Sequence, residues 1–177
     1  MARPPARIAI VGRAGSGKTT VARELGRRLD LPVVHLDALF WTADWKEVDR
    51  DVFEARQANA VRGERWIVDG GYLSSRGWPE RLRRAELVVV TEAPLAICLW
   101  RVMRRLLRRG DRRADRPDGA HEQFSPRFLW WVATWQRRHP DLARRIAAAA
   151  PEMRVLVVRR LEDLADITPS AAMSSSA

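Results

Sequence analysis

A chain of 177 residues, 46% hydrophobic and 31% charged, is long enough to bury a sizeable core and predicts one globular domain over residues 1–177. No apolar run approaches the length of a membrane span, residues 1–7 lack the apolar core of a signal peptide, and the one cysteine excludes an internal disulfide, so we expect a cytoplasmic protein without a membrane partner. The net charge of +10 leaves two partners open, a nucleic acid or a phosphate-bearing small molecule held by arginines.

The first motif along the chain is a glycine-rich loop, G-x-x-x-x-G-K-[ST], at residues 12–19. An apolar run at 8–11 predicts a buried strand before it, and the helical spacing of Val21, Leu25 and Leu29 predicts a helix after it. In this context Lys18 would reach the β- and γ-phosphates of ATP, and the Thr19 hydroxyl would ligate Mg²⁺ at the helix N-terminus. The predicted ATP-binding residues are Gly12, Arg13, Ala14, Gly15, Ser16, Gly17, Lys18, Thr19 and Thr20.

Strands and helices then alternate along the chain. Apolar runs predict further strands at 33–36, 66–68, 87–91 and 155–158, and helical spacing or caps predict helices at 48–62, 79–84, 92–109, 127–149 and 161–167. The helix at 48–62 is expected to bury Val48, Val52, Ala55, Ala58 and Val61, and the helix at 127–149 is expected to bend at Pro140. This alternation predicts a three-layer α/β fold around a five-stranded parallel sheet, followed by a disordered tail at 168–177.

Acidic residues follow two of the predicted strands, where parallel sheets bind their ligands. Asp69 is predicted to hold Mg²⁺ or to position a phosphate acceptor, in preference to merely beginning a turn. His35 is interpreted as a strand residue beside the core, and the aromatic stripe of 128–135 as core; Trp41 either lines a substrate pocket or caps the core. The predicted acceptor-binding residues are Asp37, Trp41, Gly70, Tyr72, Arg76 and Arg81.

Arginines concentrate in one segment, with eight of them between residues 101 and 116. This segment runs from a predicted helix into a loop at about 110–126, whose length is typical of functional loops such as lids. An arginine-rich lid would spread its charge over a moving phosphoryl group and would exclude water. The predicted catalytic residues are Lys18, Asp37, Asp69, Arg101, Arg105, Arg112 and Arg116, with Thr19 and Asp69 at the metal.

Several motifs occur together in one order. They are the loop at 12–19, H-L-D-x-L-F-W at 35–41, W-I-V-D-G-x-Y at 66–72, L-W-R-V at 99–102 and R-P-D at 116–118. The set resembles the bacterial adenylate-kinase-related P-loop proteins that carry the name DNA topology modulation protein (FlaR type). The resemblance implies the nucleoside-monophosphate-kinase fold with a short lid. It implies Gly15, Gly17, Lys18, Thr19 and Thr20 at the phosphates, Asp37 and Asp69 on the acceptor side, and Arg101, Arg105 and 112–116 on the lid side.

The chain departs from this family pattern at two positions near the expected acceptor. Gly71 stands where the family's D-G-N-Y carries an amide, and Glu92 stands where the fourth strand usually ends in aspartate. An extra residue after Arg76 leaves open whether Arg76 or Arg81 meets the acceptor.

Two hypotheses follow from the sequence. The first is a Mg²⁺- and ATP-dependent kinase that phosphorylates a small nucleotide or a related phosphate acceptor. The second is a nucleic-acid-binding regulator of DNA topology or transcription that binds or slowly hydrolyses ATP, suggested by the arginine run and by the family's name. The orientation of the arginine run, toward the P-loop or outward as a stripe, discriminates between them. The sequence indicates neither the acceptor nor an oligomeric state.

Overall fold

The computed structural model describes residues 3–42, 44, 46–107 and 126–167. The predicted tail and all of the predicted lid except Pro126 lie outside these residues, as do Arg112 and Arg116. Within the described parts, no helix combines the length and the apolar character that a membrane span needs.

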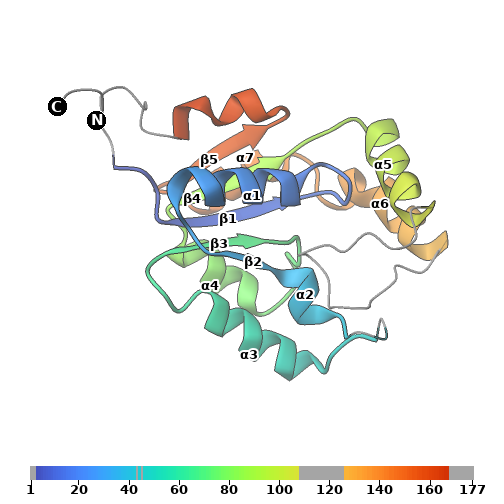
Figure 1. The fold of residues 1–177 in the computed structure, drawn as a ribbon, viewed down its shortest axis with the longest axis horizontal. Coiled ribbons are helices and arrows are strands. Elements are labelled where there is room, and N and C mark those ends of the chain that lie inside the picture. The colour runs from blue at the N-terminus through green and yellow to red at the C-terminus, as the bar shows by residue number, and fades with distance from the viewer. Residues whose placement is uncertain (1–2, 43, 45, 108–125, 168–177) are drawn as a thin grey trace.

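Five parallel strands form the centre of the structure, which confirms the predicted sheet (Figure 1). They are β1 (Arg7–Gly12), β2 (Val33–His35), β3 (Trp66–Asp69), β4 (Leu87–Thr91) and β5 (Arg154–Val158). Their spatial order is β2-β3-β1-β4-β5, so β1 lies in the middle between β3 and β4. Strands β1, β3 and β4 are almost entirely buried, as expected for a parallel sheet that is covered on both faces.

Helices cover both faces of this sheet and create two hydrophobic cores. On one face, α1 (Lys18–Leu29) and the 3₁₀ helix η1 (Leu161–Ile167) pack over Ile8 and Ile10 of β1. On the other face, α3 (Arg50–Ala60), α4 (Gly77–Arg84) and α7 (Leu142–Ala149) pack over Ala9 and Val11. The alternation of side chains along β1 thus supplies both cores, and the predicted three-layer α/β fold is confirmed.

The remaining helices lie toward the carboxyl ends of the strands. The five-residue helix α2 (Leu36–Phe40) follows β2 directly, and α5 (Leu95–Leu107) and α6 (Pro126–Arg138) stand side by side beyond the end of β1 (Figure 1). The predicted helix at 127–149 is interrupted rather than bent. Proline cannot donate the backbone bond that a continuous helix requires, and Asp141 next to it takes a φ of +45°, so α6 and α7 are separate.

The predicted inner face of the helix at 48–62 is wrong for Val52, Ala55 and Ala58, which are exposed, whereas Val61 is buried and Val48 packs against the core as predicted. Asp49 caps the helix by accepting hydrogen bonds from the N–H groups of Asp51 and Val52, which places Phe53 and Gln57 on the buried side. Val52 is 43% exposed, whereas Phe53 is 3% exposed and its ring contacts Phe40 and Tyr72. The weakly apolar residues at 48–58 gave no clear stripe, so the aromatic side chain decides which face is buried.

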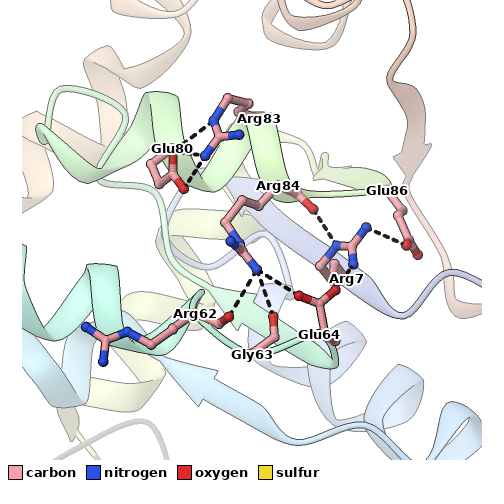
Figure 2. Close-up of polar contacts among 8 residues, drawn as sticks. All are labelled: Arg7, Arg62, Gly63, Glu64, Glu80, Arg83, Arg84 and Glu86. Carbon is pink, nitrogen blue, oxygen red and sulfur yellow. Dashed lines mark hydrogen bonds and ion pairs between the residues drawn. The ribbon is translucent and has the colours of Figure 1, made fainter.

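Arginines near the amino ends of the strands are engaged by acidic residues (Figure 2). Arg7 pairs with Glu64 at 2.6 Å and with Glu86 at 2.8 Å, and its Nε donates to the Arg84 carbonyl at 2.7 Å. Arg84 in turn donates to the Arg62 carbonyl and to Glu64. This network joins the starts of β1, β3 and β4 at the sheet edge opposite the glycine-rich loop, and it neutralises part of the basic charge there.

The assignment of the α3 core face leads to a stability prediction. Phe53→Ala removes a buried ring and should lower the free energy of unfolding by about 3–5 kcal/mol. The matched control Val52→Ala, one residue earlier on the exposed face, should change it by no more than about 0.5 kcal/mol. Denaturant unfolding of both variants measures the difference, and equal losses would contradict the assignment.

Candidate active site

The glycine-rich loop passes so close to its neighbours that two of its positions exclude a side chain. A Cβ at Gly12 would stand 2.4 Å from the Thr91 Oγ1 atom, and a Cβ at Gly15 would stand 2.5 Å from the Cys98 carbonyl oxygen. Gly15 also has a φ of +80°, which favours glycine. The loop therefore lies directly against the end of β4 and against α5, and α1 begins immediately after it at Lys18.

The backbone carbonyl of Arg13 accepts several hydrogen bonds from within the loop and from the start of α1. It accepts hydrogen bonds from the Lys18 Nζ at 3.0 Å, from the Ser16 Oγ at 2.7 Å and from the Ser16 N–H at 3.2 Å. The Ser16 hydroxyl also shares a 2.6 Å hydrogen bond with the Thr91 hydroxyl. The side chain of Lys18 therefore reaches back across the loop to the backbone of Arg13.

Thr19, Asp69 and His35 form a hydrogen-bonded group at the end of β3. The Thr19 hydroxyl donates to the Asp69 Oδ2 atom at 2.9 Å, and the His35 Nδ1 atom lies 2.9 Å from the same oxygen. The other oxygen, Asp69 Oδ1, is buried without a hydrogen-bond partner among the described residues. The Thr19 hydroxyl and the Asp69 carboxylate offer oxygen ligands of the kind that Mg²⁺ prefers. Mg²⁺ usually takes few protein ligands and completes its coordination shell with water and phosphate oxygens.

A second carboxylate, Asp37, lies at the start of α2 and is paired with Tyr72. The Tyr72 hydroxyl donates to the Asp37 Oδ1 atom at 2.7 Å, and Tyr72 holds a φ of +35° while its ring contacts Phe40 and Phe53. Asp37 is exposed to solvent, yet the protein around its carboxyl group removes hydration and raises its pKa. The Tyr72 hydrogen bond and then the Lys18 charge lower this pKa in part. Burial and the Asp37 charge raise the pKa of Tyr72, so its phenol remains a donor.

The two arginines that the sequence left as alternatives lie in different surroundings. Arg76 is exposed and pairs with Asp51 of α3. Arg81 is 2% exposed, donates to the Gly71 carbonyl at 2.8 Å and stacks over the Trp78 ring, while its Nε and Nη1 atoms have no partner among the described residues. Burial lowers the pKa of Arg81 to about 10, against the opposing effect of the Asp69 charge, so it stays cationic at neutral pH.

The arginine run is divided between the loop and the outer surface. Arg101 donates to the Gly15 carbonyl at 3.2 Å, and Arg105 is close enough to Asp37 that its charge lowers the pKa of that carboxyl. Arg104 instead stacks over the exposed Trp100 ring. The described part of the run therefore sends two arginines toward the P-loop and the acidic residues rather than forming a continuous outward stripe.

Gly70 and Trp41 both lie next to α2, the helix that carries Asp37. A Cβ at Gly70 would stand 2.7 Å from the Leu36 Cβ atom, so this position allows β3 to turn against α2. The Trp41 ring packs edge-on against Phe40 at the end of α2.

Two residues near the acids were not assigned a site role from the sequence. The Trp135 ring of α6 lies 3.4 Å from the position of a Cβ at Gly71, so it covers the loop that follows Asp69. His35 contacts Asp69 directly. The helical stripe that includes Trp135 is indistinguishable from core in a sequence, whereas the H-L-D motif at a strand end offered a signal for His35.

Comparison with solved structures finds several kinases with a similar fold. A shikimate kinase from Acinetobacter baumannii bound to shikimate superimposes with a TM-score of 0.62 at 18% identity, covering 91% of this chain and 89% of that one. A gluconokinase from Sinorhizobium meliloti 1021 gives 0.57 at 16% identity, covering 94% and 90%. A deoxyadenosine kinase from M. mycoides with bound dATP gives 0.51 at 12% identity, covering 91% and 95%. At such identities these likenesses show the α/β fold.

The sequence match covers only a short part of the chain. A cytidylate kinase from Pyrobaculum islandicum is 64% identical over 33 residues, and this match spans 19% of the chain and 18% of that protein's length. No family model matches the chain. Neither the sequence match nor the similar structures support the DNA-topology role that the resemblance to the FlaR-type proteins implied.

The raised pKa of Asp37 leads to a prediction about pH and stability. Because folding raises this pKa, the charged carboxylate opposes folding at pH values above the ordinary pKa of an aspartate. The effect is absent at lower pH, where the carboxyl is protonated in both the folded and the unfolded state. Asp37→Asn, which can still accept from Tyr72, should therefore raise the free energy of unfolding at pH 7 but not at pH 3.

Asp163 provides a control of opposite sign. The backbone N–H groups of Arg160 and Arg159 lower its pKa, so the carboxylate stabilises the fold at pH 7. The loss in free energy of unfolding caused by Asp163→Asn should therefore be larger at pH 7 than at pH 3. Denaturant unfolding at both pH values measures the two variants. A stability gain for Asp37→Asn that is equal at pH 3 and pH 7 would contradict the assignment.

Proposed function

We propose that this protein is an ATP-dependent kinase that transfers the γ-phosphoryl group to a small nucleotide or a related phosphate acceptor. The observation that carries the proposal is the juxtaposition of the P-loop lysine with Asp37. Lys18 stands close enough for its charge to lower the pKa of a carboxyl that also accepts a hydrogen bond from Tyr72. In this proposal Lys18 would bind phosphate and Asp37 would orient the acceptor beside it, and such positioning supports phosphoryl transfer.

The proposed nucleotide site consists of residues 12–20. Its backbone N–H groups and the N-terminus of α1 would hold the phosphates of ATP, and Lys18 would exchange the Arg13 carbonyl for a phosphate oxygen. Thr19 and Asp69 would hold Mg²⁺, which when bound supplies charge neutralisation at the transferring phosphates.

The proposed acceptor site lies between Asp37, Tyr72 and the loop at Gly70 and Gly71. For an acceptor that reacts through a hydroxyl, Asp37 would accept the hydrogen bond of that group and so aim its oxygen at the γ-phosphorus. Arg81 donates to the Gly71 carbonyl of this loop, and its Nε and Nη1 atoms have no partner in the part of the chain that the structure describes, which suits the attraction of an anionic group on the acceptor. The proteins similar to this chain are named for kinases of shikimate, of gluconate, of deoxyadenosine and of cytidylate, which supports a small acceptor.

Arg101 and Arg105 supply positive charge on the lid side of this site. Both belong to α5, and Arg101 touches the P-loop backbone through the Gly15 carbonyl. Their charge would offset the negative charge that accumulates on the phosphoryl group during transfer. Arg112 and Arg116, which lie outside the described residues, are proposed to act in the same way when the lid closes.

Activity measurements with a lysine pair test the proposal. With Mg²⁺, ATP consumption should be stimulated by one member of a panel of nucleoside monophosphates, nucleosides and small phosphorylated metabolites. Lys18→Ala should lower the stimulated rate by about 100-fold or more, because it removes a charge-stabilising donor from the transition state. Lys46→Ala changes the chain's other lysine, which is exposed, and should leave the rate unchanged.

Two results would contradict the kinase proposal. One is a slow ATP loss that no acceptor stimulates. The other is activity that survives Lys18→Ala. In either case, the nucleic-acid hypothesis predicts DNA binding that weakens steeply with salt and is lost when Arg104, Arg105, Arg108 and Arg109 are neutralised.

A further inference from the structure

His35 and Asp69 are neighbours because of the sheet register. Strands β2 and β3 are parallel, and their pairing sets Val33 opposite Ile67, Val34 opposite Val68 and His35 opposite Asp69. Partners in register point to the same face of a sheet, so the imidazole and the carboxylate meet at the strand ends. Both are buried, with 8% and 5% exposure, and the Nδ1 to Oδ2 distance is 2.9 Å.

The Asp69 carboxylate is held from two directions at the same oxygen. Thr19 at the start of α1 donates to Oδ2, and His35 at the end of β2 approaches that atom from the neighbouring strand. Two hydrogen bonds at one oxygen restrict rotation about the Cβ–Cγ bond of Asp69 and leave Oδ1 as the atom without a partner among the described residues. The orientation of the proposed metal-side carboxylate thus depends on both contacts.

Other roles for His35 fit this geometry less well. As a base for the acceptor it would have to contact Asp37 or the space beside it, but its described hydrogen bond goes to Asp69. As a member of a protein-built metal cluster it would need further ligands, and the described residues contain no group of three or more histidine, cysteine or acidic side chains suited to a metal. As a core residue it would need only burial, which does not account for its specific bond to a strand-end carboxylate.

We propose that His35 is a positioning residue that donates a hydrogen bond from Nδ1 to Asp69 and thereby sets the carboxylate for Mg²⁺ that arrives with a nucleotide. This inference rests on the proposed nucleotide site. Thr19 would be shared between Asp69 and the metal, whereas the described hydrogen bond of His35 goes to Asp69. His35 therefore preserves the orientation of Asp69 through the binding event. Outer partners of this kind typically contribute 10-fold to 100-fold to metal affinity.

Two amide substitutions separate positioning from packing. In His35→Asn the side-chain nitrogen occupies about the place of the imidazole Nδ1, whereas in His35→Gln it occupies about the place of Nε2, so only asparagine can still donate to Asp69. Calorimetry would measure the affinity for ADP with Mg²⁺ and with a chelator in the full chain and in both variants. Melting temperatures would report whether each variant is folded.

We expect all three proteins to bind metal-free ADP with similar affinity. The gain in ADP affinity on adding Mg²⁺ should be kept in His35→Asn and reduced by about 10-fold to 100-fold in His35→Gln. An unchanged gain in His35→Gln would overturn the inference. Equal losses in both variants, with metal-free binding also weakened, would overturn it in favour of simple packing. Failure of the unaltered protein to bind ADP under either condition would instead overturn the proposed function.

A measurement on the unaltered protein keeps the inference testable if a variant does not fold. Nitrogen-15 spectra of the imidazole should show the proton on Nδ1, and the signal should move when ADP is added with Mg²⁺ and much less when ADP is added with a chelator. A proton on Nε2 alone would overturn the inference, because Nδ1 would then have nothing to donate to Asp69.

Discussion

The register of the parallel strands is the constraint on which the candidate site depends. Ile10 of β1 and His35 of β2 both pair with Asp69 of β3, and Gly12 pairs with Thr91 of β4. The register therefore brings the glycine-rich loop, Asp69 and the start of α2 with Asp37 to one edge of the sheet. A shift of one residue in β2 would turn His35 to the opposite face and would also move Asp37 away from Lys18.

The sequence was sufficient for the fold because its signals were local and strong. Runs of three to five residues, mostly apolar, fit the strands of a parallel sheet, and the G-x-x-x-x-G-K-T loop identified the strand and helix on either side of it. The sequence was a weaker guide to which side chains of a helix are buried, because burial depends on contacts with distant segments. The inner face of α3 is set by Phe53 packing on Phe40 and Tyr72, residues from two other segments. Weak apolar spacing within α3 carries no information about those partners.

The same distinction explains what could be foreseen of the candidate site. Lys18, Asp37 and Asp69 follow from motif position and from strand ends, and the structure brings them to one place. The surroundings of Arg76 and Arg81 could not be foreseen from the sequence. The two arginines are only five positions apart, yet Arg76 pairs with Asp51 of α3 at the surface, whereas Arg81 is buried. The role of His35 depended on strand order, since only a β2-β3 pairing sets it against Asp69.

The Arg13 carbonyl has a consequence for the conformational entropy of Lys18. It accepts one hydrogen bond from the Lys18 ammonium group and another from the Ser16 hydroxyl. An ammonium group has three N–H donors, so this bond uses one of them. A lysine side chain loses rotamer freedom when it is ordered. Because the carbonyl already orders Lys18 in the folded chain, any anion that binds the ammonium group meets a side chain that has lost much of that freedom beforehand.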